Sequence, residues 1–188
     1  MNTSDEFANK KDEVLLKDFS RKKCKQSFNE LYSRYSERIG WFVMRICNHD
    51  ADLVLDVVQE TFLKVYQKAN SFKNNSSFSS WLHRIALNTA INSYNKNKKV
   101  SSYDNETLSN MLKQESFEVD YIKNEDLLLL RKQISLLPIK LKQVMILKIY
   151  DNMKYGDIAK TLEISLRTVK NRISQAITEI QHGFKNDR

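Results

Sequence analysis

Glycine and proline are nearly absent from this chain, and their shortage restricts its fold more than any other feature of the sequence. The 188 residues include three glycines and one proline. Tight turns between short β-strands depend on glycine, so a β-sandwich or a Greek-key barrel is excluded. Gly-rich phosphate loops are excluded as well, because neither GxGxxG nor GxxxxGK[ST] occurs. Since 41% of the residues are hydrophobic, the chain can still bury a core, and we expect an all-α protein.

Charge divides the chain into blocks. Residues 27–100 hold 10 basic and 6 acidic side chains, residues 127–188 hold 12 and 5, and residues 101–126 between them hold 2 and 7. The middle block is polar and weakly periodic, which predicts a flexible acidic linker between two small helical domains. Residues 1–26 are an N-terminal extension for which no role is predicted. The two basic blocks suit a polyanion such as nucleic acid, although Lys-rich helix faces can also simply be solvated.

Three amphipathic helices are predicted in the first block, because apolar residues recur there at three- and four-residue steps. The first runs to about Ile46 and is interrupted at Asn48-His49-Asp50. A polar loop at 71–80 separates the second helix, about 51–69, from the third, about 80–95. The apolar face of the second helix is assigned to Leu55, Val58, Phe62, Val65 and Ala69.

The second block is also predicted to be helical. One helix runs from Leu127 to Leu137, and Pro138 fits the first turn of the next, where its missing N–H costs little. Asp151-Asn152 ends that second helix near Tyr150, since Asn tolerates the left-handed conformation of a helix C-terminus. Two short helices follow, at about 154–162 and 166–181.

The last two helices have the spacing of a helix-turn-helix, with Glu163-Ile164-Ser165 as the connection. Apolar residues on the final helix include Val169, Ile173 and Ile177, and polar residues occupy the opposite side. In such a motif the second helix enters the major groove, where Asn, Gln and Arg read bases and Lys holds phosphates. A helical hairpin with a charged outside is the alternative, but the strongly basic block favours DNA binding. The candidate residues are Arg167, Thr168, Lys170, Asn171, Arg172, Ser174 and Gln175.

The second helix of the first block carries a small acidic cluster. Asp56, Gln59 and Glu60 lie at i, i+3 and i+4 and therefore share a face. An acidic cluster in a basic domain suits a basic partner protein better than DNA, although a solvated helix face is the simpler interpretation of three residues alone.

The third helix carries an aromatic ring, a guanidinium group and a line of amides within an arc of roughly 80°. The residues are Trp81, Arg84, Asn88, Asn92 and Asn95. Such a face suits single-stranded nucleic acid, whose bases stack on aromatic rings and present free edges to amides. The preceding loop, with Phe72 and Phe78, could form a pocket for an extruded base. The alternative is that Phe72, Phe78 and Trp81 are core residues, as the aromatic residues of small helical domains often are.

Two groups of motifs resemble a known family. The run Asp56-Val57-Val58-Gln59-Glu60-Thr61-Phe62, followed by Trp81-Leu82-His83-Arg84-Ile85-Ala86-Leu87-Asn88, resembles the second region of bacterial RNA polymerase sigma factors. The segments around Leu136-Leu137-Pro138, Tyr155-Gly156-Asp157-Ile158-Ala159 and Arg167-Thr168-Val169-Lys170-Asn171-Arg172 resemble their fourth region. With only these two regions and a linker, the chain is similar to the extracytoplasmic-function (ECF) group of the sigma-70 family.

The resemblance implies a role for each candidate surface. Asp56, Gln59 and Glu60 would face the clamp helices of the largest subunit of core RNA polymerase, and the fourth-region candidates would contact the −35 element of promoter DNA. The resemblance also implies an anti-sigma factor as a partner. Gly156 and Gln175 depart from the residues common in the family, and the second departure puts the −35 sequence in doubt. The residues implied at the −10 element are Phe72, Lys73, Asn74, Phe78, Trp81, Arg84, Asn88, Asn92 and Lys96.

The leading hypothesis is therefore a sigma factor that binds core polymerase, recognises the −10 and −35 elements and helps to open the DNA. The alternatives are a helix-turn-helix regulator that binds duplex DNA without polymerase, and a helical adaptor. An enzyme is not expected, because the three histidines are scattered and no nucleophile–base pair can be proposed. No metal or cofactor is expected either. Without a long apolar run, we expect no signal peptide and no membrane insertion, and a cytoplasmic location.

Overall fold

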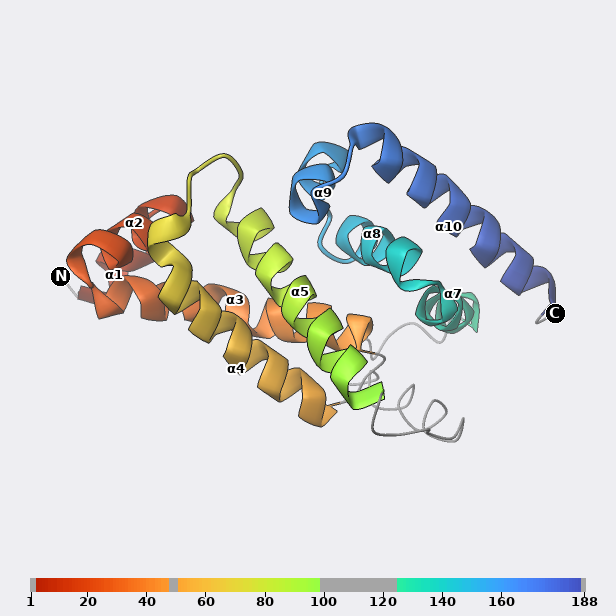
Figure 1. Cartoon of the computed structure of the whole chain (residues 1–188), viewed down its shortest axis with the longest axis horizontal. Coiled ribbons are helices and arrows are strands. Elements are labelled where there is room, and N and C mark those ends of the chain that lie inside the picture. The colour runs from red at the N-terminus through yellow and green to blue at the C-terminus, as the bar shows by residue number, and fades with distance from the viewer. Residues whose placement is uncertain (1–2, 48–50, 99–124, 187–188) are drawn as a thin grey trace.

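A computed structural model describes residues 3–47, 51–98 and 125–186, and in these residues it contains helices and no strand (Figure 1). The predicted all-α class is confirmed. The elements of a first helical group are α1 (Thr3–Ala8), α2 (Asp12–Lys22), α3 (Lys25–Ile46), α4 (Ala51–Lys68), the short 3-10 helix η1 (Ala69–Ser71) and α5 (Phe78–Lys98). Those of a second group are α7 (Glu125–Leu136), α8 (Ile139–Ile149), α9 (Tyr155–Leu162) and α10 (Leu166–Asn186). The Asn48-His49-Asp50 interruption and nearly all of the predicted linker lie outside the described residues.

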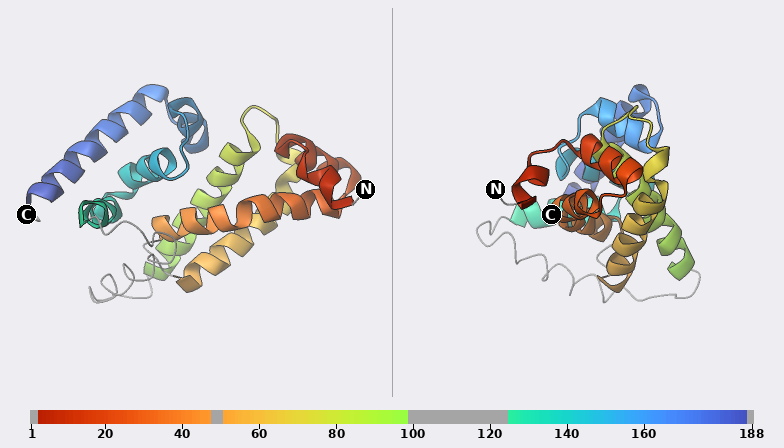
Figure 2. Two further views of the ribbon diagram at one scale, coloured as in Figure 1. Left: turned by 180° about the vertical axis from the view of Figure 1, so that it is seen from behind. Right: turned by 90° about the vertical axis from the view of Figure 1, so that its left-hand side faces the viewer.

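The first group is a bundle of α3, α4 and α5, in which α4 and α5 lie side by side (Figures 1 and 2). The apolar face of α3 is buried at Leu31, Ile39 and Phe42, while Tyr32 is 45% exposed. The predicted face of α4 was wrong at one position, because Leu55 is 61% exposed while Val54 and Val57 are buried. Adjacent positions on a helix point about 100° apart, so assigning Leu55 to the core displaced the edge of the buried face by one residue.

The described part of the N-terminal extension, residues 3–26, is folded onto this bundle rather than extending away from it. The guanidinium group of Arg34 in α3 donates hydrogen bonds to the backbone oxygens of Phe7, Ala8 and Lys10 at 2.7–3.0 Å. It also pairs with Asp12 at 2.6 Å and with Glu30 at 2.8 Å. Four of these five interactions hold α1 and the start of α2 against α3, and the pair with Glu30 lies within α3.

The second group owes its short connections to three residues at helix ends. Pro138 precedes α8 as its N-cap with φ −52°, one position before the predicted first turn, and its carbonyl accepts the N–H groups of Leu141 and Lys142. Asn152 adopts the predicted left-handed conformation with φ 49°. Glu163 ends α9 in the same conformation, with φ 54°. A residue with a Cβ in this region is uncommon, and here it makes the tight turn that places α10 across α9.

The two groups meet where α9 packs on α5 and α8 packs on α3. Asp151, just after α8, is buried at this junction. Its Oδ1 lies 3.2 Å from Nε2 of the inaccessible His83 and accepts a hydrogen bond of 3.0 Å from Nε of Arg38. Burial opposes ionisation of this carboxyl, but His83 and Arg38 outweigh that effect and lower the pKa of Asp151. At the surface of the same junction, Arg84 of α5 forms an ion pair with Glu163.

Replacing Asp151 by Asn keeps the size of the side chain but removes the charge that His83 and Arg38 share. Removing one partner of a buried charged cluster costs about 3 kcal/mol or more, so we expect the free energy of unfolding, measured with urea at neutral pH, to fall by about 3 kcal/mol. Arg84→Gln breaks only the surface pair and should cost at most about 1 kcal/mol. Equal losses in the two variants would contradict this account of the junction.

The wild type and Asp151→Asn can also be compared as a function of pH. Because the pKa of Asp151 is lowered by folding, its stabilising effect is complete above the ordinary value of 3.8 and is lost as the pH falls through the lowered pKa. The difference in stability between the wild type and Asp151→Asn should therefore close only below about pH 4.

Candidate nucleic-acid and protein interfaces

The outer face of α10 is the clearest candidate for contact with duplex DNA. Val169, Ile173 and Ala176 are buried against the rest of the second group and fix the rotation of the helix. Ser165 begins it as an N-cap, since its Oγ accepts the N–H of Thr168 at 3.0 Å. The opposite face is free to meet a groove. Of the predicted residues, Arg167, Lys170, Asn171, Ser174 and Gln175 are exposed, and Thr168 and Arg172 are half-buried.

Two details of α10 differ from the sequence analysis. The helix extends to Asn186 rather than to about residue 181. Ile177, expected on the apolar side, is exposed. In Figures 1 and 2, α10 lies on the side of the second group that faces away from the first group, so the junction does not cover its outer face.

The outer face of α4 combines acidic, amide and apolar side chains. Asp56, Gln59 and Glu60 are exposed, and Glu60 pairs with Lys64 at 2.7 Å. Sequence reasoning missed three apolar residues on this face. Leu55, Leu63 and Tyr66 are each about half exposed or more, at 61%, 56% and 49%. Exposed apolar side chains beside carboxylates are characteristic of a protein-binding surface, because a partner can desolvate the centre while charges orient it.

The loop between η1 and α5 is held firmly at both ends. At its start, the N–H of Phe72 donates to the carbonyl of Ala69. At its end, Ser77 caps α5 through the N–H of Ser80, and Glu13 of α2 accepts the N–H of Phe78 at 2.9 Å. Between these anchors Lys73 and Asn74 are exposed, and Asn74 has φ 59°. The loop therefore presents polar side chains from a fixed base.

Of the three aromatic residues around this loop, two belong to the core, which was the alternative to contact with a base. Phe78 is inaccessible and meets the ring of Tyr35 edge to face, with the ring centres 5.3 Å apart, and Trp81 is also buried. Direct contact of these two residues with DNA is not compatible with this structure, so the core alternative holds for both. Phe72 is half-buried, with its ring 5.3 Å from that of Trp81. The buried rings support the loop, and Phe72 is the least buried of the three aromatic residues.

The polar face of α5 is otherwise present as predicted. Asn88, Asn92 and Lys96 are exposed in a row along the helix. Arg84 lies on the same side but is half-buried, because it pairs with Glu163 of the second group. This face offers amide donors and acceptors and the ammonium group of Lys96, which can bind base edges and phosphates.

Within the described residues, no three side chains of His, Cys, Asp or Glu gather as metal ligands would. The helices that the structure describes include none with both the length and the apolar character needed to cross a membrane.

Comparison with known proteins places two family regions on this chain. A model of sigma-70 region 2 matches residues 31–100, and a model of sigma-70 region 4 matches residues 127–180. The ECF RNA polymerase sigma-E factor of Escherichia coli K12 is 32% identical over 179 residues, covering 88% of this chain and 90% of the relative. The RNA polymerase sigma-H factor of Pseudomonas aeruginosa is 31% identical over 170 residues, covering 86% and 88%.

Two solved structures share the fold. CnrH, in complex with the cytosolic domain of CnrY, matches with a TM-score of 0.71 at 19% identity, covering 94% of this chain and 99% of that one. The sigma factor RpoE of Bartonella quintana, in complex with the anti-sigma factor NepR, matches with a TM-score of 0.58 at 22% identity, covering 87% and 99%.

Proposed function

Because the chain belongs to the ECF group of the sigma-70 family, it is a sigma factor that directs RNA polymerase to promoters, and we propose the surfaces that carry out each part of this function. The observation that supports the assignment most strongly is the presence of both family regions, in order, each with exposed candidate residues on the expected helix. The relatives are sigma factors, which are binding subunits rather than enzymes. Since these proteins work on core polymerase, we propose that this chain acts in the cytoplasm.

The outer face of α4 is the proposed contact with the clamp helices of the largest polymerase subunit. Asp56, Gln59 and Glu60 supply negative charge and hydrogen-bonding groups. Leu55 and Leu63, both more than half exposed, supply apolar area beside them. Burying this area on a helical partner contributes to affinity, while the carboxylates select a basic partner and set the register.

The face of α5 and the loop before it are the proposed contacts with the melted −10 element. Asn88 and Asn92 can pair with the edges of unstacked bases, and Lys73 and Lys96 can hold phosphates. Arg84 belongs to this surface but is paired with Glu163 in the structure. Binding of the strand would therefore exchange one anionic partner of Arg84, the carboxylate, for another, a phosphate.

The outer face of α10 is the proposed reader of the −35 element. Asn171, Ser174 and Gln175 can address base edges in the major groove, and Arg167 and Lys170 can contact bases or backbone. A regulator acting on duplex DNA alone would use this helix but would leave the exposed faces of α4 and α5 without a purpose. Family membership favours the polymerase subunit over that alternative.

We also propose that an anti-sigma factor controls this chain. Both structural neighbours are described as complexes with a second protein, and the partner of RpoE is named as an anti-sigma factor. The exposed apolar residues of α4 are needed for polymerase and are therefore suitable to be covered by such an inhibitor.

Reversing the charge of Glu60 tests the polymerase contact. Glu60→Lys should weaken binding to core polymerase by about tenfold or more, because it places a positive charge opposite a basic partner. Binding is measured by competition with a labelled sigma factor for purified core enzyme. Glu37→Lys makes the same charge change at an exposed position of α3 and should bind normally. Equal affinities for the two variants would remove α4 from the interface.

Truncating Asn88 tests the −10 contact. Asn88→Ala removes a base-edge partner on α5 and should slow the formation of the open complex by about tenfold, a loss of about 1.4 kcal/mol, while core binding stays unchanged. Unpaired thymines around −10 are detected with permanganate. Asn29→Ala, an exposed amide on α3, is the control. Unchanged permanganate reactivity in Asn88→Ala would count against this role.

Two neighbouring residues of α10 should behave differently at the −35 element. Lys170→Ala should weaken binding of holoenzyme to all −35 sequences alike, because a phosphate contact carries no sequence information. It should also reduce the slope of log K against log salt concentration by about 1, since one fewer counterion is released. Asn171→Ala should instead change which bases are preferred. Selection from promoters randomised at −35 measures both effects, and a result with neither change would place recognition elsewhere.

A further inference from the structure

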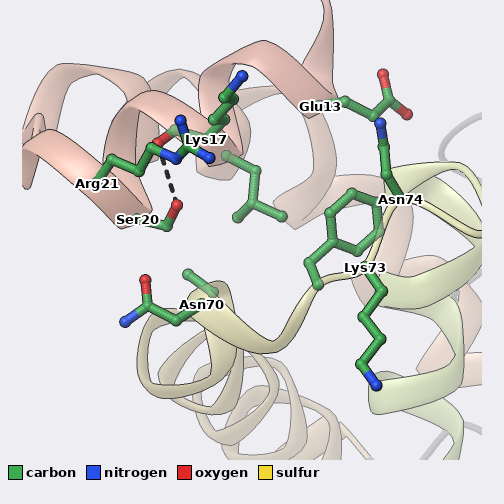
Figure 3. A pocket seen from close by; sticks show the side chains of 10 residues that line it. Glu13, Lys17, Ser20, Arg21, Asn70, Lys73 and Asn74 are labelled. Carbon is green, nitrogen blue, oxygen red and sulfur yellow. Dashed lines mark hydrogen bonds between the residues drawn. The ribbon is translucent and has the colours of Figure 1, made fainter.

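A pocket of about 350 Å³ lies between α2 on one side and η1 with the loop that follows it on the other (Figure 3). Lys17, Ser20 and Arg21 of α2 line one wall, and Asn70, Lys73 and Asn74 line the other. The volume falls at the lower end of the range for small-ligand sites, about 300–1,000 Å³. One wall belongs to the proposed −10 surface, and the other to residues 1–26, for which sequence reasoning found no role.

The lining of the pocket holds more cations than carboxylates. Among the ion pairs of the described residues, none involves Lys17, Arg21 or Lys73, and all three side chains are exposed. Two other lysines of this region differ, since Lys10 and Lys22 both pair with Asp18. Glu13 is the one carboxylate in the lining, and its Oε1 accepts the N–H of Phe78. Three cations against one carboxylate leave the cavity net positive, which attracts an anionic ligand.

The floor of the pocket is apolar. Leu16 is buried beneath it, and Phe72 lies at its edge with the ring supported by Trp81 at 5.3 Å. An aromatic ring held on one side by another ring offers its remaining surface for stacking. The side chains of Ser20, Asn70 and Asn74 add hydrogen-bond donors and acceptors around this floor. A planar base attached to phosphates matches this combination of groups.

The two walls are held at a fixed separation. Glu13 lines the pocket from α2, and its Oε1 accepts the N–H of Phe78 at the start of α5. Arg34 ties the beginning of α2 to α3 through Asp12. The pocket is therefore formed before a ligand arrives, which lowers the entropic cost of binding one.

We propose that α2 is the second wall of the site that receives one extruded nucleotide of the single-stranded −10 element. Lys17 and Arg21 hold the phosphates on either side of that nucleotide, Phe72 stacks on its base, and Ser20 contacts the base edge from the α2 side. This inference rests on the proposed −10 function and adds to it three contact residues of α2.

The test uses the full chain assembled with core polymerase and a fork template whose non-template −10 strand is single-stranded. In the double variant Lys17→Gln/Arg21→Gln, affinity for the fork should fall about tenfold or more, and the salt slope should decrease by about 1.4, since each phosphate contact on a single strand contributes about 0.7. The control Lys22→Gln/Lys23→Gln removes two charges from the end of the same helix, outside the pocket lining, and should leave both quantities unchanged.

An abasic scan of the same strand reports on the base. Wild-type holoenzyme should lose affinity when one particular base is removed, and Phe72→Ala should make it insensitive to that removal, because the stacking partner is already absent.

The outcomes separate this inference from the function on which it rests. Equal affinities and salt slopes for the pocket variant and its control, with Asn88→Ala still weakening fork binding, would overturn the role of α2 alone. A wild-type holoenzyme that binds the fork no better than a fully duplex template would overturn the −10 function and the inference together.

Discussion

The buried carboxylate of Asp151 determines how the two helical groups sit against each other. A charged group removed from water is stable only when other charges and donors surround it, and here His83 and Arg38 of the first group do so. Because these partners come from α5 and α3, the start of the second group must approach both helices. The contact of α9 with α5 and the pairing of Arg84 with Glu163 follow from that approach. The junction thus pairs Arg84, one residue of the proposed −10 surface, while Asn88 and Asn92 stay exposed.

Each proposed binding surface is the outward side of a helix whose inward side is firmly packed. Val169 and Ile173 fix α10, Val57 and Val65 fix α4, and Leu82 and Ala86 fix α5. Packing of this kind positions side chains more accurately than a loop can, which matters when bases are read by hydrogen bonds of defined geometry. The segment from Phe72 to Ser77 lies outside regular helix. Hydrogen bonds that involve Ala69, Ser80 and Glu13 at its two ends fix its position as packing fixes that of the helices.

The sequence predicted the helices and the exposed polar side of α10 well, because these depend on local periodicity. It could not decide whether Phe78 and Trp81 faced solvent, since an aromatic residue on an amphipathic helix suits either a core or a stacking surface. Leu55 was wrongly assigned to the core because periodicity does not determine whether a residue at the edge of an apolar face is buried or exposed. The packing of the N-terminal helices on the bundle could not be predicted, because Glu13 meets Phe78 across 65 residues and Arg34 binds backbone carbonyls, which have no sequence signature. Asp151 was recognised only as the end of a helix, since its partners are likewise distant in sequence.

An exchangeable subunit of RNA polymerase must change where core polymerase starts RNA synthesis, and transcription in vitro with sequencing of the RNA 5′ ends measures this. Purified core polymerase with this protein and a library of promoter fragments should start transcripts at a restricted set of positions that share −10 and −35 sequences. Start positions no more selective than those of core polymerase alone would contradict the account.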